Sequence, residues 1–277
     1  MSNKPRKMTL EKKHNLTGWA FLAPATFLIA VFSFWPMIKA LVLSFQTGKF
    51  LQSIKNTFFD FILQVPIMLV VAMVLACILN KKDLRFKGFF RTMIFLPCTT
   101  SLVAYSIIFR SLFANDGLVN YVLVNLGILD KPYNFLTQPF AAKMVIILAL
   151  LWRWTGYNMV FFLSGLQNIE YSVYEAAKID GASAIQTFFK ITVPLLKPTI
   201  LLTAIMSTNG TLQLFDESIN LTDGGPANAS ISMSHYIYNL CFKYVPNFGY
   251  AAAMSFFILL LVAVLAFIQM RVGDKRD

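Results

Sequence analysis

Six long apolar blocks, separated by shorter polar segments, run through this chain. Each block holds about 20 or more residues, the length that a helix needs to cross a hydrocarbon core of about 30 Å. In the bilayer such a block satisfies its backbone hydrogen bonds within its own helix. We therefore predict an all-α, polytopic membrane protein with six transmembrane helices. Their predicted limits are 17–45, 57–79, 89–113, 141–166, 199–221 and 248–270.

The composition supports this class. Hydrophobic residues make up 57% of the 277 residues and charged residues 13%, whereas soluble domains carry about 25% charged residues. The first apolar block is far longer than the core of a cleaved signal peptide. The three cysteines, Cys77, Cys98 and Cys241, form no CxxC pair. They predict neither a metal site nor a disulfide framework.

The Lys and Arg residues are distributed unevenly between the two sides of the predicted membrane domain. Sixteen lie in the terminal segments and in or near the loops of one side, with Arg91 at the edge of the third block counted among them, and four lie in the loops of the other side; the remaining four within the spans are left out. The side richer in Lys and Arg is normally cytoplasmic. We predict a cytoplasmic basic tail over 1–16, a transmembrane domain over 17–270 and a cytoplasmic tail over 271–277.

Prolines interrupt the first three blocks, at Pro24, Pro36, Pro66 and Pro97. Each proline removes a backbone hydrogen bond that neighbouring helices or cavity water must replace. Kinked helices suit a moving pathway, but prolines are also common in membrane helices. Both interpretations stay open.

The segment 168–198, between the fourth and fifth blocks, predicts two short helices joined by a turn on the cytoplasmic side. Each helix has a pair with capping-box spacing: Ser172 with Glu175, and Ser183 with Gln186. Gly181 suits the turn because glycine adopts a left-handed conformation without steric cost. Pro194 and Pro198 are expected to end the second helix.

The two predicted helices differ in character. Ala176 and Ala177 give the first a small-residue face, whereas Ile185, Phe188 and Phe189 make the second apolar. A compact hairpin of this kind can transmit force. From these features alone, packing against its own membrane domain is the default expectation.

The spacing within this hairpin is distinctive. Glu175-Ala176-Ala177 is followed by Gly181 six residues after the glutamate, by Ile191 ten residues further and by Pro194. It resembles the EAA loop of permease subunits of binding-protein-dependent ATP-binding-cassette importers. Further positions are similar to the maltose and lactose type of sugar importer: Asp180-Gly181-Ala182, Gln186, Phe188 and Pro198. Val193 departs from the usual leucine.

The resemblance extends over most of the chain. The segments that carry it are 33–36 with 44–45, 56–57, 95–97, 215–216, 221–226 and 248–250. One departure is plain, because the family usually has some tens of residues, including a Gly-Leu-x-Asn-Tyr stretch, between its first two core helices. Here about eleven residues join positions 45 and 57. Whether a segment is missing at this point stays open.

The resemblance implies a type I importer permease core of the MetI-like kind, in the cell membrane, with both termini cytoplasmic and no enzymatic activity. The hairpin would couple transport to a separate ATPase, with Glu175 pairing with a basic residue in a groove of that partner. The coupling residues implied are Glu175, Ala176, Ala177, Asp180, Gly181, Ala182, Ile191 and Pro194.

The resemblance also implies a set of partners. They are a second permease subunit, two ATPase subunits, an extracellular solute-binding protein, a carbohydrate substrate and membrane lipid, whereas nucleic acid is not expected. The chain has no GxxxxGK[ST] phosphate loop. We therefore expect no cofactor in this chain, and ATP and Mg bound by the partner ATPase.

Sugar recognition needs aromatic faces and hydrogen-bonding side chains, and segments 152–158 and 207–213 offer both at mid-depth in their blocks. In the family these helices line the sugar path. The resemblance favours Trp154, Gly156, Tyr157, Ser207, Asn209, Gly210, Thr211 and Gln213 as substrate-pathway residues. Alternatively, the tryptophans face lipid or the partner permease, and Asn209 and Gln213 bond between helices.

Charges within the blocks have a competing structural explanation. Arg153 is costly in a membrane helix unless paired or hydrated, and Asp216 and Glu217 lie toward the outer end of the fifth block. A helix-packing salt bridge is favoured over a substrate contact.

Two alternative functions remain to be weighed. An ion-coupled secondary transporter would also have kinked spans, but the EAA spacing argues against it. A membrane enzyme is disfavoured because His14 and His235 have no obvious acid, base or metal partner nearby in sequence. We predict no catalytic and no metal-binding residues, and we expect both histidines to be incidental.

Overall fold

The computed structural model describes residues 10–35, 38–39, 42, 48–81 and 83–273. Over these residues the chain is helical and contains no strand, as predicted. The helices are α1 (Leu10–Ile29), α3 (Gly48–Asn80), α4 (Lys87–Thr99), α5 (Leu102–Leu112), α6 (Leu118–Asn125), α7 (Pro139–Gln167), α8 (Tyr171–Ile179), α9 (Ala184–Thr187), α10 (Val193–Leu195), α11 (Lys197–Leu212), α12 (Asp216–Thr222), α13 (Met233–Tyr238) and α14 (Phe248–Gly273). Three π-helical turns accompany them: η1 (Ala30–Phe34), η2 (Phe188–Thr192) and η3 (Asn239–Lys243).

Three helices in the described part of the chain, α3, α7 and α14, are long and apolar enough to cross a membrane. Two bent pairs bring the number of candidate spans to five: α4 with α5, bent by 98°, and the segment Ala184–Leu195 with α11, bent by 70°. The first predicted block, 17–45, contains α1 and η1 and then reaches residues outside the described ranges. A shorter apolar helix, Phe21–Phe32, lies within it.

Several predicted limits were wrong. Helix α3 begins at Gly48 rather than at residue 57, so segment 50–56 is helical. The third block turns sharply because Thr100 and Ser101 adopt extended backbone conformations between α4 and α5. The fifth block ends at Leu212, and α12 then starts separately with Asp216 and Glu217 in its first turn. Acidic residues are favourable at that end of a helix.

Of the three predicted proline positions that lie within the described residues, one precedes a sharp bend. Helix α3 continues through Pro66, and α1 through Pro24. Pro97 lies near the end of α4, just before the 98° turn. Pro36 lies outside the described residues.

Helices α3 and α7 form the centre of the structure. Ala72 and Ala76 of α3 are fully buried against Met159 and Phe162 of α7. Small residues let membrane helices approach closely. Helix α4 also approaches α7 closely, because a Cβ atom at Gly156 of α7 would lie only 1.9 Å from the carbonyl oxygen of Ile94 in α4.

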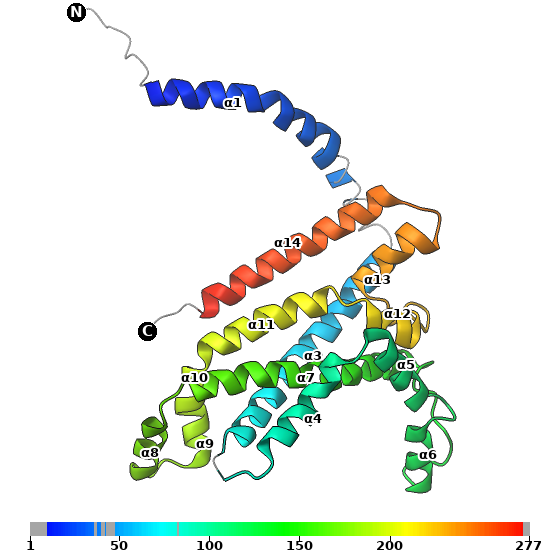
Figure 1. Cartoon of the computed structure of the whole chain (residues 1–277). Coiled ribbons are helices and arrows are strands. Elements are labelled where there is room, and N and C mark those ends of the chain that lie inside the picture. The colour runs from blue at the N-terminus through cyan, green and yellow to red at the C-terminus, as the bar shows by residue number, and fades with distance from the viewer. Residues whose placement is uncertain (1–9, 36–37, 40–41, 43–47, 82, 274–277) are drawn as a thin grey trace, which may run out of the picture.

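A second core joins α5, α7 and α12. Tyr105 and Phe109 of α5 are buried against Val145 and Ile146 of α7 and against Leu221 of α12. This core packs α5 and α12 against the first half of α7. The short helix α12 is thereby held near the end of the structure opposite the hairpin (Figure 1).

The two ends of the helical body carry different segments (Figure 1). The hairpin α8–α10, the connection between α3 and α4, and the end of α14 lie at one end. Segments α5–α6 and α12–α13 lie at the other. This is the grouping predicted for the two sides of the membrane, although which side is cytoplasmic stays a prediction.

Candidate functional site

The turn of the hairpin is built around Gly181. Its φ is +75°, in the left-handed region. The N–H of Gly181 donates to the carbonyl of Lys178 at 3.2 Å, and the N–H of Ala182 donates to that of Ala177 at 2.9 Å. These two bonds form a Schellman cap. The predicted glycine turn is confirmed, and any other residue at this position would be strained.

The second helix of the hairpin starts with the predicted capping box. Gln186 donates its N–H to the Ser183 hydroxyl at 3.3 Å, and the Ser183 N–H donates to the Gln186 side-chain oxygen at 2.8 Å. Both bonds are local, which explains why the sequence spacing was sufficient to predict them. The helix then continues through the π-helical turn η2 to α10.

The capping box predicted for the first helix is wrong. Helix α8 begins at Tyr171, with Glu170 at the N-cap, so Ser172 lies inside the first turn. The Ser172 hydroxyl instead donates to the Glu170 carboxylate at 3.3 Å. Glu175 therefore has no capping role. Within the described ranges its exposed side chain forms no hydrogen bond and no ion pair.

The hairpin presents both polar and apolar groups. Of the predicted coupling residues, Glu175, Ala176, Asp180, Gly181 and Pro194 are exposed, Ala182 and Ile191 are half-buried, and Ala177 is buried. Beside them, Ile185 is 72% exposed and Phe189 65% exposed. Phe188 packs partly against the α3–α7 core. The hairpin is thus anchored on one side and uncovered on the other.

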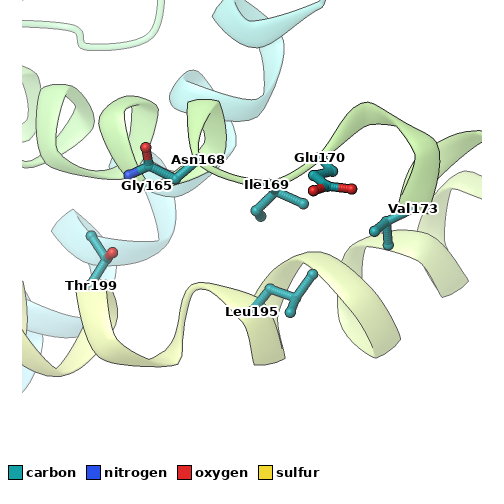
Figure 2. A pocket seen from close by; sticks show the side chains of 7 residues that line it. All are labelled: Gly165, Asn168, Ile169, Glu170, Val173, Leu195 and Thr199. Atoms are coloured by element: carbon teal, nitrogen blue, oxygen red, sulfur yellow. The ribbon is translucent and has the colours of Figure 1, made fainter.

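A cavity of about 380 Å³ lies at the base of the hairpin (Figure 2). Its walls come from the end of α7, the linker 168–170, α8, α10 and the start of α11. Glu170 supplies the charged group, and Val173 and Leu195 supply apolar walls. The structure therefore leaves space where the hairpin joins the membrane helices.

A second cavity, of about 370 Å³, lies among α3, α7 and α11 and is the candidate substrate site. Six of the eight predicted pathway residues line it: Trp154, Tyr157, Ser207, Gly210, Thr211 and Gln213. Tyr157 meets Trp154 edge to face, with ring centroids 5.8 Å apart. The cavity therefore combines aromatic faces with hydroxyl and amide groups, the chemistry that suits a sugar.

Two predicted pathway residues lie elsewhere. Gly156 is buried in the contact between α4 and α7, where it has a packing role. Asn209 is exposed, does not line the cavity, and accepts a hydrogen bond from Gln213 one turn later. This bond lies within the last turn of α11, whereas the alternative interpretation expected Asn209 and Gln213 to bond between helices.

Further cavity residues were not predicted. Gln64 and Met68 of α3, Asn158 of α7, and Phe215, Asp216 and Glu217 after α11 also line it. A signal for α3 was present, because Ser53, Asn56, Thr57, Asp60 and Gln64 recur at helical spacing in an apolar block, and all are buried. Such a stripe indicates a face turned to the protein interior.

Arg153 stabilises the bend between α4 and α5. Its guanidinium donates to the carbonyl of Thr100 at 2.7 Å and to that of Cys98 at 3.3 Å, and it stacks on the rings of Tyr105 and Trp154. The last carbonyls of a helix have no partner within the helix, and a cation there is favourable. The predicted salt bridge is wrong, since the described residues give Arg153 no carboxylate partner.

His235 is not incidental. Its side chain is fully buried, and Nδ1 lies 2.9 Å from the hydroxyl of Ser218 in α12. Burial lowers the pKa of His235 to about 4, because the charged imidazolium is poorly solvated there. The ring therefore helps to join α12 and α13 in its neutral form.

The other histidine of the sequence, His14, lies in the helical segment 10–17 at the start of α1.

A family model, described as "Binding-protein-dependent transport system inner membrane component", matches residues 37–276. The chain belongs to this family. Its members are transport components of the membrane rather than enzymes. The chain is accordingly a multi-pass component of the inner membrane, and dependence on a binding protein argues against the alternative of an ion-coupled carrier.

Several named transport proteins are similar to this chain over most of their length. The lactose transport system permease protein LacF of Rhizobium radiobacter is 49% identical, with 98% of each chain covered. The probable ABC transporter permease protein YesP of Bacillus subtilis is 34% identical, with 95% of this chain and 92% of YesP covered. The multiple sugar-binding transport system permease protein MsmF of Streptococcus mutans is 32% identical, with coverages of 97% and 99%.

Solved structures confirm the importer permease fold. A chain of a bacterial ABC transporter involved in import of the acidic polysaccharide alginate superposes with a TM-score of 0.76 at 24% identity, covering 95% of this chain and 96% of that one. A chain of an alginate transporter in complex with an alginate pentasaccharide-bound periplasmic protein gives 0.70 at 25% identity, with coverages of 95% and 94%.

Proposed function

We propose that this chain is the permease subunit through which an ATP-binding-cassette importer moves a carbohydrate across the cell membrane. One observation carries the proposal: α7 and α11 line the polar and aromatic cavity, and the exposed hairpin is the segment that joins these same two helices. A displacement of the hairpin therefore acts directly on the cavity walls.

The hairpin is proposed to dock on a separate ATPase. Glu175 is its candidate ion-pairing residue, because the carboxylate is exposed and the described residues leave it without a partner. The exposed Ala176 allows close approach of the partner, the buried Ala177 packs inside the hairpin, and Asp180, Gly181 and Ala182 hold the turn. Ile191 and Pro194 belong to the return path toward α11. ATP and Mg are proposed to bind to the ATPase partner.

A carbohydrate is the substrate class best supported by the cavity. Its volume of about 370 Å³ lies in the range of small-molecule sites, roughly 300–1,000 Å³. Trp154 and Tyr157 offer faces for sugar rings, and Ser207, Thr211 and Gln213 offer groups for hydroxyls. Relatives named for lactose and multiple-sugar transport support the same class.

The remaining partners and the orientation follow from this role. We place the hairpin and both termini in the cytoplasm, and segments α5–α6 and α12–α13 on the outer side, where a solute-binding protein would deliver the sugar. The tails are those predicted at 1–16 and 271–277. A second permease and two ATPase subunits complete the proposed assembly.

Uptake of labelled lactose and a panel of oligosaccharides tests this function in cells that produce the chain with its cognate partners. We expect uptake of at least one saccharide that requires the ATPase and persists when proton and sodium gradients are collapsed. Uptake that survives loss of the ATPase but stops with the gradients would contradict the proposal.

A further inference from the structure

Two buried amides converge on one sulfur atom in the wall of the substrate cavity. The Gln64 amide nitrogen, from α3, lies 3.1 Å from the Met68 sulfur, and the Asn158 amide nitrogen, from α7, lies 3.5 Å from the same atom. Gln64 is 1% exposed, Asn158 3% and Met68 1%. All three line the cavity.

The other bonds of these amides fix their positions. The Gln64 side-chain oxygen accepts from the Thr211 hydroxyl of α11 at 2.7 Å. The Asn158 side-chain oxygen accepts from the Ser207 hydroxyl, also of α11, at 3.3 Å, and its nitrogen donates to the Trp154 carbonyl at 3.0 Å. The amides are therefore held by two helices of the cavity wall.

The bonds to Met68 are the weak part of this arrangement. An amide can make four hydrogen bonds, and a thioether sulfur is only a weak acceptor. Leaving a buried N–H with a poor acceptor is unfavourable. A hydroxyl oxygen is a stronger acceptor with two lone pairs, so it can accept from two donors that converge on one point.

We propose that Gln64 and Asn158 are specificity-determining residues that donate together to one hydroxyl oxygen of the transported sugar, at the place where Met68 lies in this structure. The inference rests on the proposed function. Methionine has an unbranched side chain with three rotatable bonds, so its sulfur can leave this position when a sugar enters. The two amides then select for an oxygen atom at one position of the sugar.

A purely structural role predicts something different. If the amides only tie α3 to α7 through Met68, loss of an amide and loss of the sulfur weaken the same contact. Both changes would then lower transport of every sugar to the same degree. If Met68 only occupies the place of the hydroxyl, the two changes act differently, because loss of the sulfur leaves both donors available to the sugar.

The test is uptake into proteoliposomes that contain the complete transporter, supplied with its binding protein and with labelled lactose or each monodeoxy analogue of lactose. Every variant receives the same binding protein. The sugar preference of the binding protein therefore cancels when the ratio of lactose uptake to analogue uptake in a variant is divided by the same ratio in the wild type. We compare Gln64→Met, which keeps the side-chain length, with Met68→Leu, which conserves volume.

We expect wild-type protein to transport one analogue roughly 5- to 100-fold less well than lactose, the range expected for loss of one buried hydrogen bond. Gln64→Met should abolish most of that discrimination for this analogue alone. Met68→Leu should keep or increase it. Asn158→Leu provides a second variant if Gln64→Met fails to copurify with the ATPase.

Two results would overturn the inference while leaving the proposed function intact. One is that both amide variants discriminate among the analogues to the same degree as the wild type, while the wild type takes up lactose normally. The other is an equal loss of uptake in Gln64→Met and Met68→Leu with unchanged ratios. If the wild-type transporter moves no labelled saccharide, the sugar function fails, and the inference fails with it.

Discussion

The side-chain nitrogen of Asn56 lies 3.0 Å from the carbonyl oxygen of Ile231, although 175 residues separate them in sequence. It also donates to the carbonyl of Asn228 at 3.0 Å. Beside it, the Thr57 hydroxyl accepts from the N–H of Met233 at 3.1 Å. The start of α3 thus holds the loop between α12 and α13, and the first residue of α13, through side-chain hydrogen bonds.

Asn56→Leu should detach this loop from α3. The substitution leaves the buried carbonyl of Ile231 without this donor, at a cost of about 1–3 kcal/mol, whereas the half-buried carbonyl of Asn228 still accepts from the N–H of Ile231 at 3.4 Å. We expect a lower unfolding temperature of the purified complex and faster proteolysis within 223–232. Gln52→Ala is the matched control, because Gln52 makes an exposed bond to Ala227 in the same loop. An equal effect of the two substitutions would argue against Asn56 as the anchor.

The pH dependence of stability should reveal the buried His235. Its pKa of about 4 in the fold lies below the ordinary value of 6.5. The unfolded chain therefore binds a proton first as the pH falls. The contribution of the neutral ring is complete above pH 6.5 and is lost progressively between pH 6.5 and 4, by at most about 1.4 kcal/mol per pH unit.

Thermal unfolding of the purified complex at pH 7.5 and pH 5 measures this effect. His235→Asn keeps a hydrogen-bonding nitrogen near Ser218 but does not titrate. Its unfolding temperature should fall less between the two pH values than that of the wild type. Carboxylates titrate in both proteins, so they cancel in the comparison. Parallel curves would exclude His235 as the titrating group.

Local signals in the sequence were sufficient for part of this architecture. The turn at Gly181 and the capping box at Ser183 depend on residues within one or two helical turns, so spacing alone predicted them. The box at Ser172 failed because the same spacing can occur inside a first turn: α8 begins at Tyr171, so Ser172 is already helical and cannot act as the N-cap.

Long-range contacts account for the rest. Gln64 reaches Thr211 across 147 residues, and Arg153 reaches Thr100 across 53. Neither partner is visible from a single apolar block. The stripe of buried polar residues on α3 could have been noticed, but its partners in the loop between α12 and α13 and in α11 become apparent only when the helices are packed together.

Tyr157 should be needed for sugar uptake because its ring lines the cavity next to Trp154. Tyr157→Ala removes the aromatic face, and we expect uptake at low sugar concentration to fall roughly 3- to 10-fold. Tyr157→Phe keeps the face and separates stacking from hydroxyl contacts. Asn209→Ala should have a smaller effect, since Asn209 is exposed outside the cavity lining. Uptake at the wild-type rate in Tyr157→Ala would remove this residue from the pathway.

The orientation can be tested with single cysteines. Cys77, Cys98 and Cys241 are free and are first replaced by serine or alanine. Asn125→Cys in α6 should then react with an impermeant maleimide in intact cells, whereas Ile179→Cys at the end of α8 should react only after permeabilisation. Both positions are exposed in the structure, so accessibility of the side chain is not limiting. The reverse pattern would invert the proposed topology.

Glu175 provides the decisive test of coupling. Because its carboxylate makes no capping bond, Glu175→Gln removes the charge at little cost to α8: the N-cap is Glu170, and Gln and Glu have similar helix propensities. If the hairpin docks through this charge, Glu175→Gln and Glu175→Lys should both lower ATPase copurification and binding-protein-stimulated hydrolysis, by about tenfold or more.

The control is Glu170→Gln, which removes an exposed carboxylate at the N-cap of the same helix, five residues before Glu175. A general effect of negative charge on the hairpin would affect both glutamates alike, whereas a specific ion pair affects Glu175 alone. Gly181→Val serves as the positive control for collapse of the turn, because a β-branched residue is strained at a φ of +75°. Full coupling in both Glu175 variants, with loss of coupling in Gly181→Val, would show that the hairpin transmits force through its shape rather than through this charge.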